Sequence, residues 1–226
     1  MSLLVTGSPQ FEAQDEYGTG NGVWSIQQWQ SNLPVEQPSP ELLVFGELGL
    51  DPILEHTITA VQSIFSARRS SNNPGELSTT DLHDLTCFFL HRLLGLHPFT
   101  GDDSRSAHTS ECLRYGVSIY MFLVHGPTYY SHASILHSLL LQLKLHLESL
   151  ITSKPQNAFL LWLLSVGAVA ATETNESKWF RERVTALSTE MGIQYWEDFK
   201  AHMERILWFK ARAQVLFQQM WEEIIT

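Results

Sequence analysis

Three side chains that can bind metal ions lie four residues apart in the stretch DLHDLTCFFLH. At this spacing His83, Cys87 and His91 project from nearly one face of a helix, drifting by about 40° over the span. Imidazole and thiolate both bind zinc, and two donors one turn apart can hold one ion. The outer pair, however, is about 12 Å apart along the axis, too far to close on one tetrahedral centre. We therefore favour packing roles and predict no metal and no cofactor, with a metal site as the alternative.

A second set of reactive groups follows a predicted helix end in the stretch HGPTYYSH. The imidazole of His125 and the phenols of Tyr129 and Tyr130 could line the mouth of an apolar pocket and orient a small molecule by hydrogen bonds. With His91, they are the candidate catalytic residues if the chain is an enzyme. The alternative is an ordinary helix connection, because tyrosines at helix starts commonly pack half-exposed. The sequence contains no motif that names a reaction, such as Gly-x-Ser-x-Gly or His-Glu-x-x-His.

Helical periodicity supplies the elements that must position these groups, and it dominates from Glu41 onward. Asp51 and Pro52 combine a capping acid with a proline at the first helical position, so we expect a helix from there to about Arg69. A polar loop is expected over residues 101–106. The other helices are expected over residues 79–95, 111–125, 131–151, 158–171, 177–191, 196–208 and 210–224.

These elements predict an all-α fold, because no stretch alternates polar and apolar residues for long enough to indicate a sheet. We expect a single domain of about eight antiparallel-packed helices over residues 41–226. Residues 1–40 carry scattered glycines and prolines, and no Lys or Arg precedes Arg68. We interpret residues 1–40 as an irregular acidic leader.

The most apolar stretch, AFLLWLLSVGAVAAT at 158–172, could be a membrane anchor or a buried helix. Its apolar run from Ala158 to Ala171 falls short of the about 20 residues that a spanning helix needs. We therefore predict a buried core helix and no contact with a membrane. Gly167 is expected to let another helix approach closely.

Composition and charge restrict the classes of partner. The chain is 44% hydrophobic and 17% charged, as in a globular protein, and its formal charge of −10 opposes the phosphate backbone of nucleic acid. We expect no direct nucleic-acid partner. Cys87 and Cys112 lie in apolar helical contexts, which suits reduced thiols, and the start MSLLVTGSPQ lacks the features of a secretory signal. An intracellular protein, cytoplasmic or nuclear, is expected.

Several segments of the second half resemble one protein family. They are LLWLLSVGAVAAT in the fifth predicted helix, KWF at Lys178 to Phe180, YWEDFKAHMERILWF at Tyr195 to Phe209 and QMWEEI at Gln219 to Ile224. Together they are similar to the C-terminal regulatory domain of fungal zinc-cluster transcription factors, the fungal-specific transcription factor domain. The stretch ECLRYGVSIYMF, from Glu111, is also similar to a helix start in that family. The resemblance covers roughly residues 51–224 and implies a helical domain that senses metabolites or binds partners.

The chain departs from that family in its cysteines. Members that bind DNA hold two zinc ions with six closely spaced thiolates, and that number of ligands has no substitute. In this chain the two cysteines are 25 positions apart, with no basic segment beside them. A zinc cluster and DNA binding in the manner of the family are therefore not expected.

Three functions stay open. The leading hypothesis is a regulatory module in transcription regulation that binds a small apolar metabolite or a protein partner, with no DNA contact of its own. The alternative is a stand-alone fungal enzyme of secondary metabolism, of cyclase or isomerase type, with an apolar pocket inside the helical domain. The third is a structural interaction protein whose exposed Trp and Leu residues on the last two helices form a homo-oligomer interface.

Overall fold

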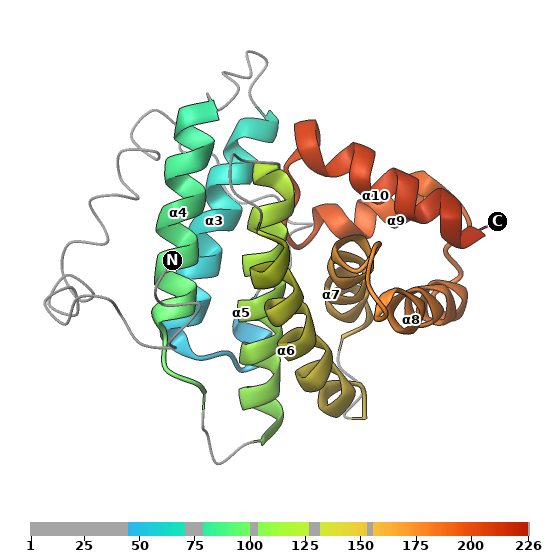
Figure 1. Ribbon diagram of the computed structural model, residues 1–226, viewed down its shortest axis with the longest axis horizontal. Helices are drawn as coiled ribbons and strands as arrows, with labels where there is room; N and C mark the ends of the chain where they lie inside the picture. Colours follow the sequence, from blue (N-terminus) through green and yellow to red (C-terminus); the bar gives the residue numbers. More distant parts are fainter. Residues whose placement is uncertain (1–44, 71–78, 100–103, 127–131, 153–155, 226) are drawn as a thin grey trace, which may run out of the picture.

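The computed structural model describes residues 45–70, 79–99, 104–126, 132–152 and 156–225, to which the following observations refer. Within these ranges the chain forms eight α-helices and one short 3-10 helix, and it contains no strand (Figure 1). The all-α fold predicted from the sequence is thus confirmed for this part of the chain. The leader expected over residues 1–40 lies outside the described residues, as do Tyr129 and Tyr130.

In chain order, the helices are η2 (Phe45–Leu48), α3 (Pro52–Ser70), α4 (Thr79–Gly95), α5 (Ser104–His125), α6 (Ala133–Ile151), α7 (Asn157–Ala170), α8 (Ser177–Glu190), α9 (Trp196–Glu204) and α10 (Lys210–Ile225).

Two helix boundaries differ from the sequence-based expectation. α5 begins at Ser104 and not at Glu111, so the end of the expected polar loop is helical; the polar residues of its first two turns conceal the periodicity. α9 ends at Glu204, whereas a helix was expected to continue to Trp208. Ile206, Leu207 and Trp208 follow it and are buried without being helical. Their apolar character reflects burial and was wrongly taken as helical periodicity.

Asp51 caps α3 as its place before Pro52 predicts. The Oδ1 atom of its carboxylate accepts the backbone N–H groups of Ile53 at 2.9 Å and Leu54 at 3.3 Å. These are donors that lack a partner within the helix, so the cap satisfies the first turn. Ile53 itself points outward and is 53% exposed.

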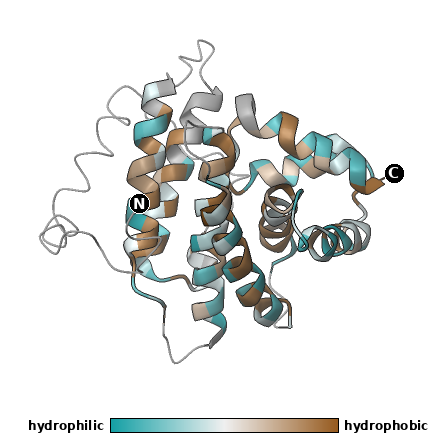
Figure 2. Cartoon of the chain, in the orientation of Figure 1, coloured by the Kyte–Doolittle hydropathy of each residue, from teal (hydrophilic) through white to brown (hydrophobic). Residues whose placement is uncertain are grey.

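α5 and α7 occupy the centre of the fold. α5 packs against α3, α4, α6, α7 and α10, and α7 packs against α5, α6, α8, α9 and α10. In Figure 1, α3 to α6 lie side by side, and α8 to α10 lie on the other side of α7. Every residue of α7 from Ala158 to Val169 is buried, and Figure 2 shows this helix in hydrophobic colours over most of its length. The predicted buried core helix is confirmed. None of the helices in the described ranges combines the length and apolar composition needed to cross a membrane.

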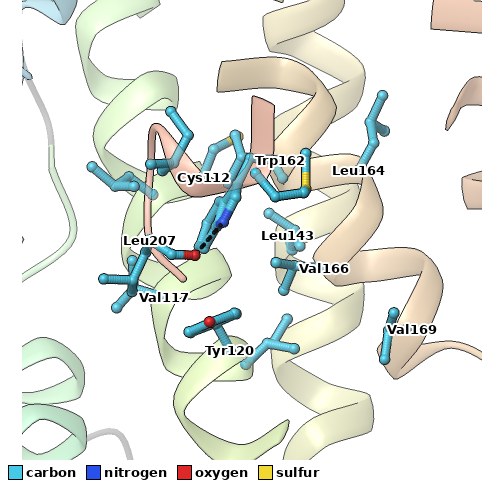
Figure 3. Close-up of a cluster of buried hydrophobic side chains, with 14 of the residues drawn as sticks. Cys112, Val117, Tyr120, Leu143, Trp162, Leu164, Val166, Val169 and Leu207 are labelled. Carbon is cyan, nitrogen blue, oxygen red and sulfur yellow. Dashed lines mark hydrogen bonds between the residues drawn. The ribbon is translucent and has the colours of Figure 1, made fainter. Parts of the chain in front are cut away.

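Trp162 of α7 anchors the connection between α9 and α10 (Figure 3). Its indole N–H donates to the backbone carbonyl of Leu207 at 3.1 Å, and its ring lies 5.5 Å from that of Tyr120 on α5. The Tyr120 hydroxyl in turn accepts the backbone N–H of Phe209 at 2.7 Å. Side chains from the two central helices therefore supply hydrogen bonds to a buried segment that has no helix of its own.

Candidate functional site

One cluster of titratable side chains joins α4 to the C-terminal end of α5. The Nε2 atom of His83 lies 3.6 Å from the Cys87 thiol, one turn further along α4. The other ring nitrogen of His83, Nδ1, lies 3.0 Å from Nε2 of His125. Nδ1 of His125 is in turn 3.3 Å from the carbonyl oxygen of Gly126. We name Cys87, His83 and His125 the thiol–imidazole cluster.

The Gly126 carbonyl determines which ring nitrogens of this cluster carry a proton. A carbonyl oxygen only accepts hydrogen bonds, so the nitrogen facing it, Nδ1 of His125, carries the proton. Nε2 of a neutral His125 is then the acceptor, and Nδ1 of His83 is the donor. Nε2 of a neutral His83 consequently carries a lone pair, and this lone pair faces the sulfur of Cys87.

The Cys87 thiol holds its proton at neutral pH. Partial burial raises its pKa above the ordinary value, and the negative charge of Asp84 raises that pKa further. Because the thiolate is the nucleophilic form, this environment does not favour Cys87 as an activated nucleophile. The S–H group can instead donate to the lone pair of His83.

The structure unites residues that the sequence placed in two separate groups. His83 and Cys87 were predicted to share a helix face and do so, while His125 came from the second set. His91 is exposed on α4, two turns from His83, and takes no part in these contacts. Among the described residues, no three or more His, Cys, Asp or Glu side chains are placed to hold a metal ion together.

A second cluster lies near the start of α5, where α5 meets α6. Arg114 donates to the Glu111 carboxylate at 2.5 Å, and only about 6% and 4% of these two side chains are exposed. Arg114 also donates to the carbonyl of Leu96 at 2.8 Å, while Glu111 accepts the backbone N–H of Phe99 at 2.8 Å. This buried ion pair therefore fixes the segment that follows α4 against α5.

Two imidazoles border the ion pair. Nδ1 of His108 lies 3.0 Å from Nδ1 of His146 on α6, and the ring of Tyr115 stacks on His146 at 5.8 Å. Burial lowers the pKa of His146, with His108 and Arg114 acting in the same direction and Glu111 opposing them. His146 is therefore held neutral to lower pH than an ordinary histidine.

The residues of this second cluster were not among the candidates predicted from the sequence. Glu111 and Arg114 are three residues apart in a helix of otherwise low charge, and this spacing was a signal that they could pair. His108 and His146 are 38 positions apart, and no local spacing relates them.

The chain matches no protein-family model, and neither the curated proteins nor the solved structures contain a match to it.

Proposed function

We propose that the chain is a regulatory module that acts by binding a protein partner, similar in kind to the regulatory domain of fungal zinc-cluster transcription factors and without DNA contact of its own. The observation that supports this proposal best is the packing of the four segments that carry the resemblance. They lie far apart along the sequence, yet side chains from each of them meet in one core.

Specific contacts join these four segments. The ring of Phe180, in the second segment, lies against Gly167 in the first. The indole of Trp162, also in the first, donates to Leu207 in the third. Phe199 of the third segment stacks on Trp221 of the fourth, with ring centroids 4.6 Å apart. The residues that carry the resemblance thus form a continuous packed unit.

The outer face of α6 offers the best candidate for partner contact. Leu141 and Leu145 are 41% and 58% exposed, one turn apart on this helix. The other large hydrophobic side chains that are exposed within the described ranges are more widely separated along the chain: Ile53, Tyr195, Val215 and Ile225. A pair of exposed leucines on one helix face suits a protein partner that presents an apolar helix or groove.

Tethering to DNA tests the proposal. The chain is fused to an unrelated DNA-binding domain in a fungal host, and transcription of a reporter is compared with that given by the DNA-binding domain alone. We expect a change in reporter output with the fusion. The double variant Leu141→Glu/Leu145→Glu should abolish that change, whereas Val215→Glu, at an isolated site that is 68% exposed, should retain it. Unaltered transcription with a folded, nuclear fusion would contradict the proposal.

The described geometry gives the enzyme alternative less support. That alternative requires His91 and His125 to act on one substrate. His125 contacts the ring of His83, and two turns of α4, about 12 Å, separate His83 from His91. The cluster at His125 also lies at the protein surface, with His83 and Cys87 exposed.

The homo-oligomer hypothesis receives little support from the tryptophans of this region. It called for exposed Trp and Leu residues on the last two helices. Trp208 and Trp221 are buried, at 5% and 2% exposure, and Trp196 is half-buried. Among the described residues of this region, the tryptophans therefore contribute to the core.

A further inference from the structure

The donor atoms of His83 and Cys87 are separated by the distance expected for two ligands of one tetrahedral zinc ion. Zinc binds thiolate sulfur at about 2.3 Å and imidazole nitrogen at about 2.0–2.1 Å, so a tetrahedral angle places the two donors about 3.6 Å apart. The observed distance between Cys87 Sγ and His83 Nε2 is 3.6 Å. An ion can therefore be bound by both side chains with little rearrangement of α4.

The outer hydrogen bonds prepare His83 for this role. Because the Gly126 carbonyl fixes the protons of both rings, Nδ1–H of His83 points to His125 and the lone pair on Nε2 points to Cys87. In metal sites, the ligating imidazole almost always donates its other N–H to a carbonyl, a carboxylate or another acceptor, which orients the ring and raises its basicity. His125 occupies the position of that acceptor.

The formal charge of the whole chain, −10, favours the approach of a cation at long range. His83 and Cys87 are both exposed, so an ion reaches them directly from solvent.

We propose that His83 Nε2 and Cys87 Sγ form a surface site for a divalent ion of the zinc class, with His125 as the positioning residue. On binding, the sulfur–metal bond replaces the S–H bond and the thiol proton passes to solvent. The site differs from the one considered in the sequence analysis, because His91 is not a ligand and His125 acts through His83.

His83 and Cys87 fill two of the four positions around a tetrahedral ion, so two further ligands are needed. No set of three or more donor side chains converges within the described part of the chain. We take the remaining ligands to be water molecules or the same two side chains of a second copy. Two copies would complete a Cys₂His₂ site, a common structural zinc site. Metal stoichiometry distinguishes these sources: one ion per chain indicates water, and one ion per two chains indicates a second copy.

Cobalt(II) titration of the purified, reduced chain tests the site. Co²⁺ stands in for Zn²⁺ and gives a thiolate-to-metal charge-transfer absorption in the near ultraviolet when sulfur is a ligand. We expect this absorption in the wild-type protein, its loss on addition of Zn²⁺, and its absence in Cys87→Ser. His83→Gln should weaken binding by more than 100-fold, since it removes a direct ligand. His125→Phe should weaken it by about 10- to 100-fold, the usual effect of losing an outer hydrogen bond.

His91→Gln is the matched control, because His91 is an exposed imidazole on the same helix, one turn beyond Cys87. It should bind Co²⁺ as tightly as the wild type, and circular dichroism should show that all variants keep their helix content. Three results would overturn the proposal: no charge-transfer absorption in the wild type, an absorption that persists in Cys87→Ser, or equal affinities of His83→Gln and His91→Gln. The last would indicate adventitious binding by surface imidazoles.

Discussion

The ring of Phe180 lies so close to Gly167 that a Cβ atom on residue 167 would fall well under 3.0 Å from three of its carbons. Gly167→Ala must therefore displace a fully buried aromatic ring at the contact between α7 and α8. Overpacking of this kind costs about 1–3 kcal/mol, against a gain of up to about 1 kcal/mol in helix propensity. We expect net destabilisation, measured as a lower denaturation midpoint in urea.

Gly95→Ala provides the control for that substitution, because no atom lies within 4 Å of the Cβ position at Gly95. It should leave stability nearly unchanged. Phe180→Leu, introduced together with Gly167→Ala, should recover part of the loss specific to the clash. If Gly167→Ala were as stable as the wild type, this result would contradict the close contact between Gly167 of α7 and Phe180 of α8.

The buried pair of Glu111 and Arg114 is expected to be sensitive to loss of one member. Glu111→Ala leaves the guanidinium of Arg114 buried without its carboxylate, and such changes cost about 3–5 kcal/mol in unfolding free energy. The double variant Glu111→Leu/Arg114→Met removes both charges and should be destabilised less than Glu111→Ala. Chemical denaturation of the three proteins measures the difference.

The exposed pair of Glu197 and Lys200 supplies the comparison for this prediction. Its charged atoms lie 3.3 Å apart, and Glu197 is 76% exposed. Solvent screens such a pair, so Glu197→Ala should change stability by no more than about 1 kcal/mol. Equal effects of Glu111→Ala and Glu197→Ala would contradict the buried network.

The lowered pKa of His146 predicts that the folded protein loses stability in mild acid. Its folded-state pKa lies below the ordinary 6.5, because burial disfavours the charged ring; His108 and Arg114 act in the same direction, and Glu111 opposes them. Above pH 6.5 the ring is neutral in both states, and its contribution is fully present. As the pH falls from 6.5 through the folded-state pKa, the unfolded chain binds the proton more readily, so stability decreases.

Urea denaturation at pH 7.5, 6.5 and 5.5 measures this dependence. His146→Gln should show a smaller decrease over that interval than the wild type. A residual decrease is expected from His202, whose pKa is also lowered by burial and by Arg205. A pH dependence unchanged by His146→Gln would exclude His146 as a source.

The two cysteines should react at different rates with a thiol reagent. Cys87 is exposed, whereas Cys112 is fully buried and burial raises its pKa well above the usual range. One thiol per chain should therefore react in the native protein and the second only after denaturation. Asp84→Asn should accelerate labelling of Cys87 near pH 8, because loss of the negative charge lowers the thiol pKa. Asp198→Asn, on α9, should not.

Periodicity was sufficient to predict most of the helical fold but not every boundary. The strongly apolar α7 was correctly expected to be buried. The start of α5 was missed because its first turns are polar, and the apolar residues after Glu204 were taken for helix because burial outside a helix requires the same residue types. The bounds of an element depend on backbone hydrogen bonds, which composition alone does not reveal.

Only the local part of the candidate site was predictable. His83 and Cys87 are one helical turn apart, so their shared face followed from helix geometry. Their relation to His125, 42 positions along the chain from His83, arises from the packing of α4 against α5. Which nitrogen of His83 carries the proton depends in turn on Gly126, and no spacing rule connects those residues.

Gly126 ends α5 with a φ of 78°, a left-handed conformation that glycine adopts at little cost, and its N–H donates to the carbonyl of Phe122 at 3.1 Å. Its carbonyl oxygen is the acceptor for His125, at the inner end of the hydrogen bonds that reach Cys87. The turn that ends α5 thereby determines that Nε2 of His83, on α4, carries the lone pair. The position of the lone pair on His83 thus follows from a main-chain torsion angle at Gly126, while burial and the charge of Asp84 raise the pKa of the neighbouring Cys87 thiol.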